Sequence, residues 1–213
     1  MKKIFCFLLG IIAIVNLYFF VGAKQVKSDE EIVKDISEKL IRFHVIANSD
    51  EETDQQLKIK VKDNIINYIF PKLKDSKSID ESRDILRNNN KQILKIAEKT
   101  IKENGYNYTV NSTLDRENFP EKNYGNITLP QGEYEAYRVI IGSGQGKNWW
   151  CVMFPPLCFV DVTKGQVSDK ETEETMKRVL DDDEYTEISN KNDKNKIKIK
   201  FKIVEIIKDL IDK

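Results

Sequence analysis

Two apolar runs flank a glycine-rich segment in Tyr137-Arg-Val-Ile-Ile-Gly-Ser-Gly-Gln-Gly-Lys-Asn-Trp-Trp-Cys-Val-Met-Phe154. In the first run Tyr137, Val139 and Ile141 alternate with other residues, which is the period of a strand. The second run, from Trp149 onward, is rich in residues that favour strands. The glycines between the runs supply the positive φ that a tight turn needs. The stretch therefore predicts two strands joined as a β-hairpin.

Three further strands are predicted from compact or alternating apolar runs. They are expected at residues 40–47, 106–110 and 197–203. In the second, Tyr106, Tyr108 and Val110 alternate with polar residues, as in a half-buried strand. In the third segment, 197–203, apolar residues alternate with lysines, so one face of this strand should be exposed to solvent. A polar linker at 189–196 is expected before it and a short closing helix at 204–211 after it.

Four helices are predicted from capping boxes, in which a serine hydroxyl and a glutamate three residues later satisfy backbone amides at a helix start. The boxes are Ser28–Glu31, Ser49–Glu52, Ser78–Glu81 and Ser168–Glu171. The second helix should stop before Pro71, and the third at Asn104-Gly105. The fourth should end by the acidic run 181–184, which lacks the spacing of a calcium loop and is expected to be a solvated face.

Together these elements predict an α+β fold: a single domain with a mixed or antiparallel sheet packed by about four helices. The chain has 213 residues, 35 basic and 35 acidic, so its formal net charge is zero. That balance argues against a dedicated nucleic-acid binder. With one histidine and three cysteines, no multi-histidine metal site is expected, and we expect neither a metal nor a cofactor.

The N-terminus carries the pattern of an export signal. Lys2 and Lys3 precede an apolar run from Ile4 to Val21, and Val21-Gly-Ala23 fits a cleavage site. The run is also long enough to remain as a membrane anchor. We therefore expect a signal peptide or anchor at 1–23 and an extracytoplasmic domain at 24–213.

Few residues suggest catalysis. His44 could act as a general base that a nearby acid such as Asp50 orients. No G-x-S-x-G elbow and no Cys-x-x-Cys or His-x-x-x-His spacing accompanies it. The glycine-rich segment 142–147 is not a phosphate-binding loop, because Ile141 and Asn148 stand where glycine and Ser or Thr are needed. A structural or interface role is expected for His44.

Cys151 and Cys158 are the cysteines left after export, and Pro155-Pro156 lies between them. A turn at the prolines could bring their Cα atoms within the ~4.4–6.8 Å that a disulfide requires. An oxidising compartment favours the bond. Two buried free thiols are the alternative.

Three unusual motifs follow one another behind the export signal: Arg42-x-His44-Val-Ile-Ala-Asn48-Ser49-Asp50, Tyr124-Gly125-x-x-x-Leu-Pro130-x-Gly132-x-Tyr134, and Gly146-Lys-Asn-Trp149-Trp150-Cys151-Val-Met-Phe154-Pro155-Pro156-Leu157-Cys158-Phe159-Val160-Asp161. Together, in this order, they closely resemble the stage II sporulation protein R family. They span residues 42–161, and the mature chain matches in length and order.

The resemblance implies a secreted intercellular signal of endospore formation. Family members are exported from the forespore into the space between the two septal membranes. There they trigger a mother-cell membrane protease, the stage II sporulation protein GA, which processes the precursor of sigma factor E. The resemblance implies no enzyme and no catalytic residues, and the charge balance predicts no nucleic-acid partner. Membrane contact is expected only through the N-terminal segment.

Two alternatives remain open: an extracytoplasmic hydrolase centred on His44, and a wall- or membrane-associated structural module. For the signalling interpretation, the binding candidates are Trp149, Trp150, Pro155 and Pro156. Successive strand residues face opposite sides of a sheet, so one tryptophan should anchor the core and the other should point outward or lie under a covering element. We expect the outward tryptophan and the Pro155-Pro156 turn to contact the protease, with a Cys151–Cys158 bond stiffening them.

Overall fold

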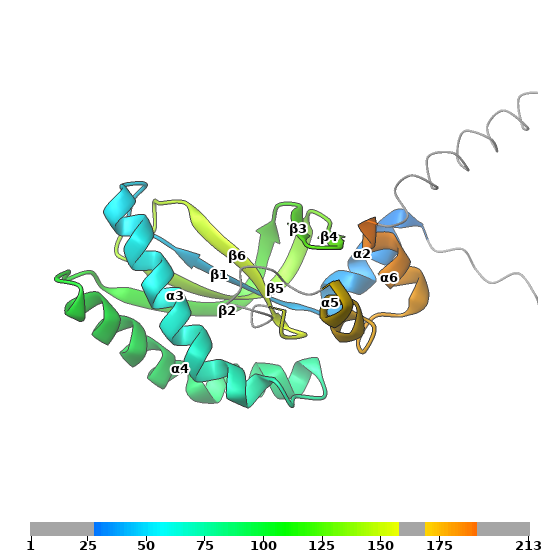
Figure 1. Ribbon diagram of the computed structural model, residues 1–213, viewed down its shortest axis with the longest axis horizontal. Coiled ribbons are helices and arrows are strands. Elements are labelled where there is room, and N and C mark those ends of the chain that lie inside the picture. Colours follow the sequence, from blue (N-terminus) through cyan, green and yellow to red (C-terminus); the bar gives the residue numbers. More distant parts are fainter. Residues whose placement is uncertain (1–27, 158–168, 191–213) are drawn as a thin grey trace, which may run out of the picture.

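The computed structural model describes residues 28–157 and 169–190 (Figure 1). The helices are α2 (Asp29–Glu38), α3 (Glu52–Leu73), α4 (Ile79–Glu103), α5 (Asp169–Met176) and α6 (Asp182–Ile188). The strands are β1 (Ile41–Ile46), β2 (Val110–Phe119), β3 (Lys122–Tyr124), β4 (Ile127–Leu129), β5 (Gly132–Ile141) and β6 (Asn148–Phe154). The predicted α+β class is confirmed. The described residues do not include the predicted export signal at 1–23, Cys158, Ser168 or the predicted elements at 197–211.

The main sheet has four strands in the order β2-β5-β1-β6 and is mixed. β1 runs parallel to β5 and antiparallel to β6, so that Phe43 lies between Tyr137 and Cys151. The predicted hairpin between β5 and β6 is therefore wrong, because β1 is inserted between them. The glycine-rich loop crosses the end of β1, where the Gly146 N–H donates to the Ala47 carbonyl oxygen at 2.9 Å.

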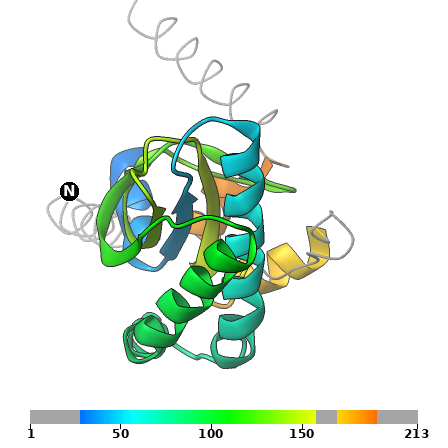
Figure 2. The same ribbon diagram turned by 90° about the vertical axis from the view of Figure 1, so that its left-hand side faces the viewer.

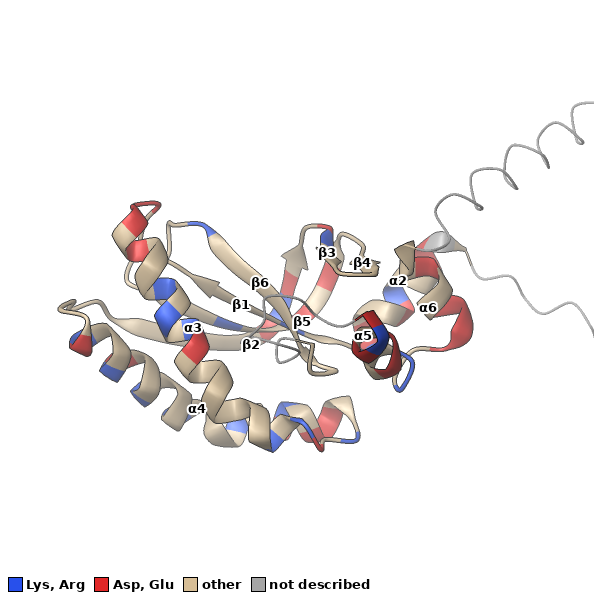
Figure 3. Cartoon of the chain, viewed as in Figure 1, with Lys and Arg blue, Asp and Glu red and all other residues tan. Residues whose placement is uncertain are grey.

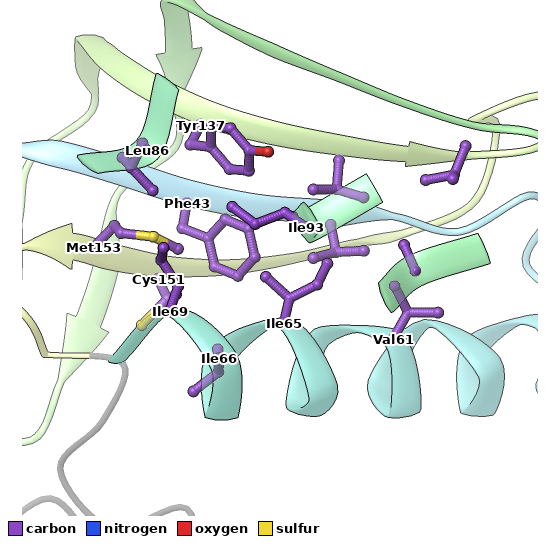
Figure 4. Close-up of a cluster of buried hydrophobic side chains, with 14 of the residues drawn as sticks. Phe43, Val61, Ile65, Ile66, Ile69, Leu86, Ile93, Tyr137, Cys151 and Met153 are labelled. Carbon is purple, nitrogen blue, oxygen red and sulfur yellow. The ribbon is translucent and has the colours of Figure 1, made fainter. Parts of the chain in front are cut away.

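One face of the sheet is covered by α3 and α4, which lie side by side (Figures 1 and 2). Their apolar stripes meet the sheet in a buried cluster (Figure 4), which includes Phe43, Val61, Ile65, Ile69, Leu86, Ile93, Tyr137, Cys151 and Met153. α4 begins as predicted, since the Ser78 hydroxyl accepts from the Glu81 N–H at 3.1 Å. It ends as predicted at Asn104 and at Gly105, which has a φ of 83°.

The opposite face is covered at one end by α2, α5 and α6. α2 starts with the predicted capping box at Ser28. The acidic run 181–184 is solvated as expected at Asp181, Asp182 and Asp183, but it also begins α6 and turns Glu184 inward. The Glu184 carboxylate is 2% exposed, binds Lys39 at 2.7 Å and accepts from the Asp181 N–H at 2.8 Å. Figure 3 shows the acidic residues of α5 and α6 gathered at this end.

Three predicted boundaries differ from the structure. The Ser49 hydroxyl does not cap α3; it donates instead to the Asp54 carboxylate at 2.7 Å. α3 continues through Pro71, since only its last turn follows and Leu73 is fully buried there. Tyr106 and Tyr108 stack on each other before β2, which begins only at Val110. No helix within the described ranges is long and apolar enough to span a membrane.

Candidate functional site

Trp149 and Trp150 lie on opposite faces of β6, as strand geometry predicts. Trp149 packs on the cluster beneath α3, edge to face with Phe43 at a centroid distance of 6.0 Å. The Lys62 ammonium lies 4.7 Å from the centroid of its ring. Trp150 packs on the other face of the sheet. Each indole is half-buried, so both pack on a buried cluster and both remain partly open to solvent, one on each face of the sheet.

Trp150 is part of an aromatic stack that joins three segments of the chain. Its ring lies parallel to that of His44, its direct cross-strand partner, at 4.9 Å and 10°. It also meets Phe119 edge to face at 4.8 Å. The Lys122 ammonium lies 5.9 Å from the indole centroid, at the outer rim of a cation–π contact. On the side of this stack that remains partly open to solvent, the Trp150 indole thus lies beside the Lys122 side chain.

Arg42 lies next to this stack, against the Phe119 ring, and is fully buried. Its guanidinium carbon is 4.5 Å from the Phe119 centroid and 4.7 Å from that of Tyr134. The guanidinium donates to the Tyr124 hydroxyl at 3.0 Å and to the Cys151 carbonyl oxygen at 3.3 Å. Within the described residues no carboxylate pairs with Arg42, and its Nη1 lacks a hydrogen-bond partner.

The tyrosines around Arg42 do not supply a negative charge. Burial raises the pKa of Tyr134 to about 12 and also raises that of Tyr124. Both phenols therefore stay neutral at physiological pH. We call the set Arg42, His44, Phe119, Tyr124, Tyr134 and Trp150 the cation–aromatic cluster.

His44 does not have the surroundings of a catalytic base. Burial, together with the positive charges of Arg138 and Arg42, lowers the pKa of His44 to about 4. Its Nδ1 lies 3.5 Å from the Asn148 amide nitrogen, and its buried Nε2 has no hydrogen-bond partner in the part of the chain that the structure describes. Asp50 does not orient the imidazole, because its carboxylate accepts from the Lys147 N–H at 2.7 Å.

The loop after β1 and the glycine-rich loop after β5 are joined by hydrogen bonds between Asn48 and Ser143. The sequence analysis did not predict this contact. The Asn48 side chain accepts from the Ser143 N–H at 3.0 Å and donates to the Asp54 carboxylate at 2.9 Å. Burial alone would raise the pKa of Asp54, but hydrogen bonds from Ser49, Asn48 and Tyr108 outweigh it and hold that pKa below its usual value. A Cβ on Gly142 would collide with the Asn48 side chain. The sequence signal was the polar run that ends the Arg42–Asp50 motif.

The Pro155-Pro156 turn directly follows β6, the strand that carries Trp150. Pro155 follows a cis peptide bond and is buried, while Pro156 is half-buried. A cavity of about 520 Å³ adjoins the turn. It is lined by Lys74, Asp75, Ser76, Lys77, Phe154, Pro155, Pro156, Arg178 and Val179. The cavity thus borders the connection between α3 and α4, and Trp150 is not among its lining residues.

Cys151 is disulfide-bonded. It is 4% exposed and lies in the core beneath α3 (Figure 4). Cys158 is outside the described residues, so the pairing of these two cysteines stays a prediction.

Over residues 28–157 and 169–190, no group of three or more His, Cys, Asp or Glu side chains is placed to hold a metal ion. The fold and its best-formed site define a small α+β domain with a buried cation–aromatic cluster under a half-open sheet face.

Comparison with known proteins gives the family. The family described as stage II sporulation protein R matches residues 37–164. The chain is also 37% identical to the stage II sporulation protein R of Bacillus subtilis (strain 168), over 97% of this chain and 96% of that protein. No solved structure matches. The chain belongs to the stage II sporulation protein R family.

Proposed function

We propose that this protein is a secreted signal of endospore formation that activates a membrane-embedded protease of the stage II sporulation protein GA type. The activated protease would then process the precursor of sigma factor E. The signal would act in the space between the forespore and mother-cell membranes, and would stay tethered there if residues 1–23 are not cleaved. Membership of the family, over nearly the whole length of a relative named as a sporulation protein, is the observation that carries the proposal.

The site geometry agrees with a binding role. The half-exposed Trp150 indole is a rigid apolar group of the kind that anchors protein interfaces. His44, the centre of the alternative hydrolase, is buried beside two guanidinium groups and has no orienting acid among the described residues. The structure therefore gives no specific support to a hydrolase, and we do not propose one.

Reconstitution tests the proposal. The purified fragment 24–213 would be added to proteoliposomes that contain the protease and the sigma factor precursor, with the fragment on the extracytoplasmic side. We expect precursor cleavage only when fragment and protease are both present. Cleavage by the fragment without the protease would indicate a hydrolase instead. A folded fragment that leaves the protease inactive, while the full-length chain is also inactive in cells that contain the protease, would overturn the proposal.

A further inference from the structure

One edge of the main sheet is formed by a long, regular strand, β2. It is the outermost strand in the order β2-β5-β1-β6, and it pairs one to one with β5 from Val110 to Phe119. The Thr109 carbonyl oxygen accepts from the Gly142 N–H at 2.8 Å, and this bond fixes the alternation of the ladder. The odd-numbered residues of β2 therefore bond to β5. The backbone groups of the even-numbered residues from 112 to 118 point away from the sheet.

These outward groups have no backbone partner in the part of the chain that the structure describes. The Arg116 N–H donates instead to the Asp115 carboxylate at 2.8 Å. An open edge of this length is a template for a further strand, and folded proteins cover or charge such edges. The opposite edge, β6, is different, because its residues 151–154 are already buried. β2 is therefore the edge that a further strand can reach.

The two faces of β2 differ in polarity. On the side of α4, Val110 is buried and Leu114 packs on the buried cluster. A cavity of about 150 Å³ opens there between Leu114, Tyr137 and α4. On the other face Asp115 is exposed and Glu117 is half-buried. A strand that fits this edge has apolar side chains on one face and cations on the other.

The C-terminal segment 197–203, outside the described residues, has this pattern. Its odd-numbered residues are three isoleucines and Phe201, and its even-numbered residues are all lysines. Residues 191–213 contain eight lysines and four acidic residues, whereas the described residues have an excess of acidic residues. A second copy of β2 would instead bring its own Asp115 and Glu117 against an acidic face. Charge complementarity therefore favours the chain's own tail.

The described part of the chain ends at the hairpin that follows β2. The Asn190 N–H donates to the Asn126 carbonyl oxygen at 2.9 Å, and its side chain donates to the Gly125 carbonyl oxygen at 3.1 Å. Both acceptors lie in the turn between β3 and β4, and β3 begins three residues after Phe119 (Figure 1). Residues 191–196 can span about 20 Å when extended. A chain that enters at the Phe119 end of the edge runs antiparallel to β2.

We propose that residues 197–203 add to the main sheet as a fifth strand, antiparallel to β2. The apolar residues of the segment lie on the side of α4, and its lysines lie on the other face with Lys198 opposite Asp115. The outward N–H and C=O groups of β2 pair with this segment. The tail thereby closes an edge that would otherwise be open to pairing between copies of the chain. This inference is independent of the proposed function.

Hydrogen exchange of the full-length chain, resolved to single amides, tests the added strand. The Ser112 and Leu114 N–H groups should exchange at least about tenfold more slowly in the full-length chain than in a chain truncated after Asn190. The Thr113 N–H is the control within the strand, because it points toward β5 and should be equally protected in both chains.

Proline substitutions repeat this test without truncation. Ile199→Pro removes an N–H from the middle of the added strand, so it should speed exchange at Ser112 and Leu114 as the truncation does. Lys194→Pro is the matched control in the linker and should leave that exchange slow. If the truncated chain does not fold, so that Thr113 also exchanges fast, the comparison of the two proline variants decides.

Disulfide cross-linking tests the register and the faces. Directly opposed residues of antiparallel strands have Cβ atoms about 4.5–5.5 Å apart, and those outside the hydrogen-bonded pairs are the closer ones. Asp115→Cys combined with Lys198→Cys in the exported chain should therefore give a linked peptide by mass spectrometry. Asp115→Cys combined with Ile199→Cys is the matched control, because position 199 faces the other side of the sheet and should not link.

The opposite results would overturn the inference. Fast exchange at Ser112 and Leu114 in the full-length chain would show that the edge is open. Slow exchange that neither truncation nor Ile199→Pro changes would show a different occupant, and a mass that rises with concentration in sedimentation would identify it as a second copy. Equal linking of Asp115→Cys to positions 198 and 199 would show a tail that is not a strand at this edge.

Discussion

The imidazole of His44 stacks on the indole of Trp150, with ring centroids 4.9 Å apart and planes 10° apart. The two residues are direct partners on the neighbouring antiparallel strands β1 and β6, and their side chains stack on the same face of the sheet. Burial of the imidazole, together with the charges of Arg138 and Arg42, disfavours its charged form. The stack is therefore built around a neutral histidine, and this makes stability depend on pH.

The free energy of unfolding should fall as the pH is lowered from about 6.5 to about 4. In this window the unfolded chain binds a proton at His44 and the folded chain does not, so protonation favours the unfolded state. A depressed histidine pKa thus contributes stability above pH 6.5 that is lost as the pH falls through the folded-state value. At about 1.4 kcal/mol per pKa unit, the loss is at most about 3.5 kcal/mol. Urea unfolding at a series of pH values measures it.

His44→Gln is the control for this pH effect. Glutamine cannot titrate, so the variant should show a much flatter dependence on pH between 6.5 and 4. It should also still trigger precursor processing, because His44 has no partner of a catalytic base among the described residues. An unchanged pH dependence would show that other groups cause it. A folded His44→Gln protein that does not signal would favour the hydrolase alternative.

Local pattern in the sequence was enough to predict most elements but not their pairing. The capping boxes at Ser28 and Ser78 and the stop at Gly105 are short-range features, and the structure has all three. The insertion of β1 between β5 and β6 depends on contacts between residues about 90–110 positions apart. No periodicity encodes such a register, so adjacency in the sequence was mistaken for adjacency in the sheet.

The candidate site could be predicted only in part. The opposed faces of Trp149 and Trp150 follow from the period of a strand alone. The position of His44 against Trp150 requires the β1–β6 register, which the sequence does not reveal. Tertiary packing also decided the end of α3, where burial of Leu73 extends the helix past Pro71.

Trp149→Ala should destabilise the protein more than Trp150→Ala. Trp149 packs on the core beneath α3, so its truncation should cost about 2–3 kcal/mol, somewhat less than for a fully buried aromatic. Trp150 makes two ring contacts at a half-open face, and its truncation should cost about 1–2 kcal/mol. Urea midpoints of the two variants provide the comparison. The reverse order would show that Trp150 is the structural anchor.

Residues 1–23 should direct export. Lys2 and Lys3, the apolar run and Val21-Gly-Ala23 motivate this prediction. Residues 1–30 fused to alkaline phosphatase, which is active only outside the cytoplasm, should give activity in a bacterial host. Changing Ile12 and Val15 to Asp interrupts the apolar run and is the matched control. Equal activity of the two fusions, or a silent wild-type fusion that is normally expressed, would contradict the prediction.

Cys151 should be bonded to Cys158 in the exported protein. Export would remove Cys6, which leaves Cys158 as the remaining partner within the chain. Non-reducing digestion and mass spectrometry should find a cross-linked peptide that contains both residues. Cys158→Ser should expose one thiol to alkylation after unfolding and lower stability by about 2–3 kcal/mol. A Cys6–Cys151 peptide, or a dimer linked through Cys151, would show that the pairing is wrong.

Gly142→Ala should disrupt the interlocked loops at the end of β1. Gly142 has a φ of 58°, and an added Cβ would collide with the Asn48 side chain. Asn48 would have to give up its bonds to Ser143 and Asp54 to make room. The backbone strain and the lost hydrogen bonds together should cost about 2–3 kcal/mol. Gly105→Ala is the matched control, because Gly105 has a φ of 83° with open space around it, and only the strain of about 1 kcal/mol should remain. Equal losses of stability in urea would show that Asn48 moves aside without cost and that the two loops are not locked together.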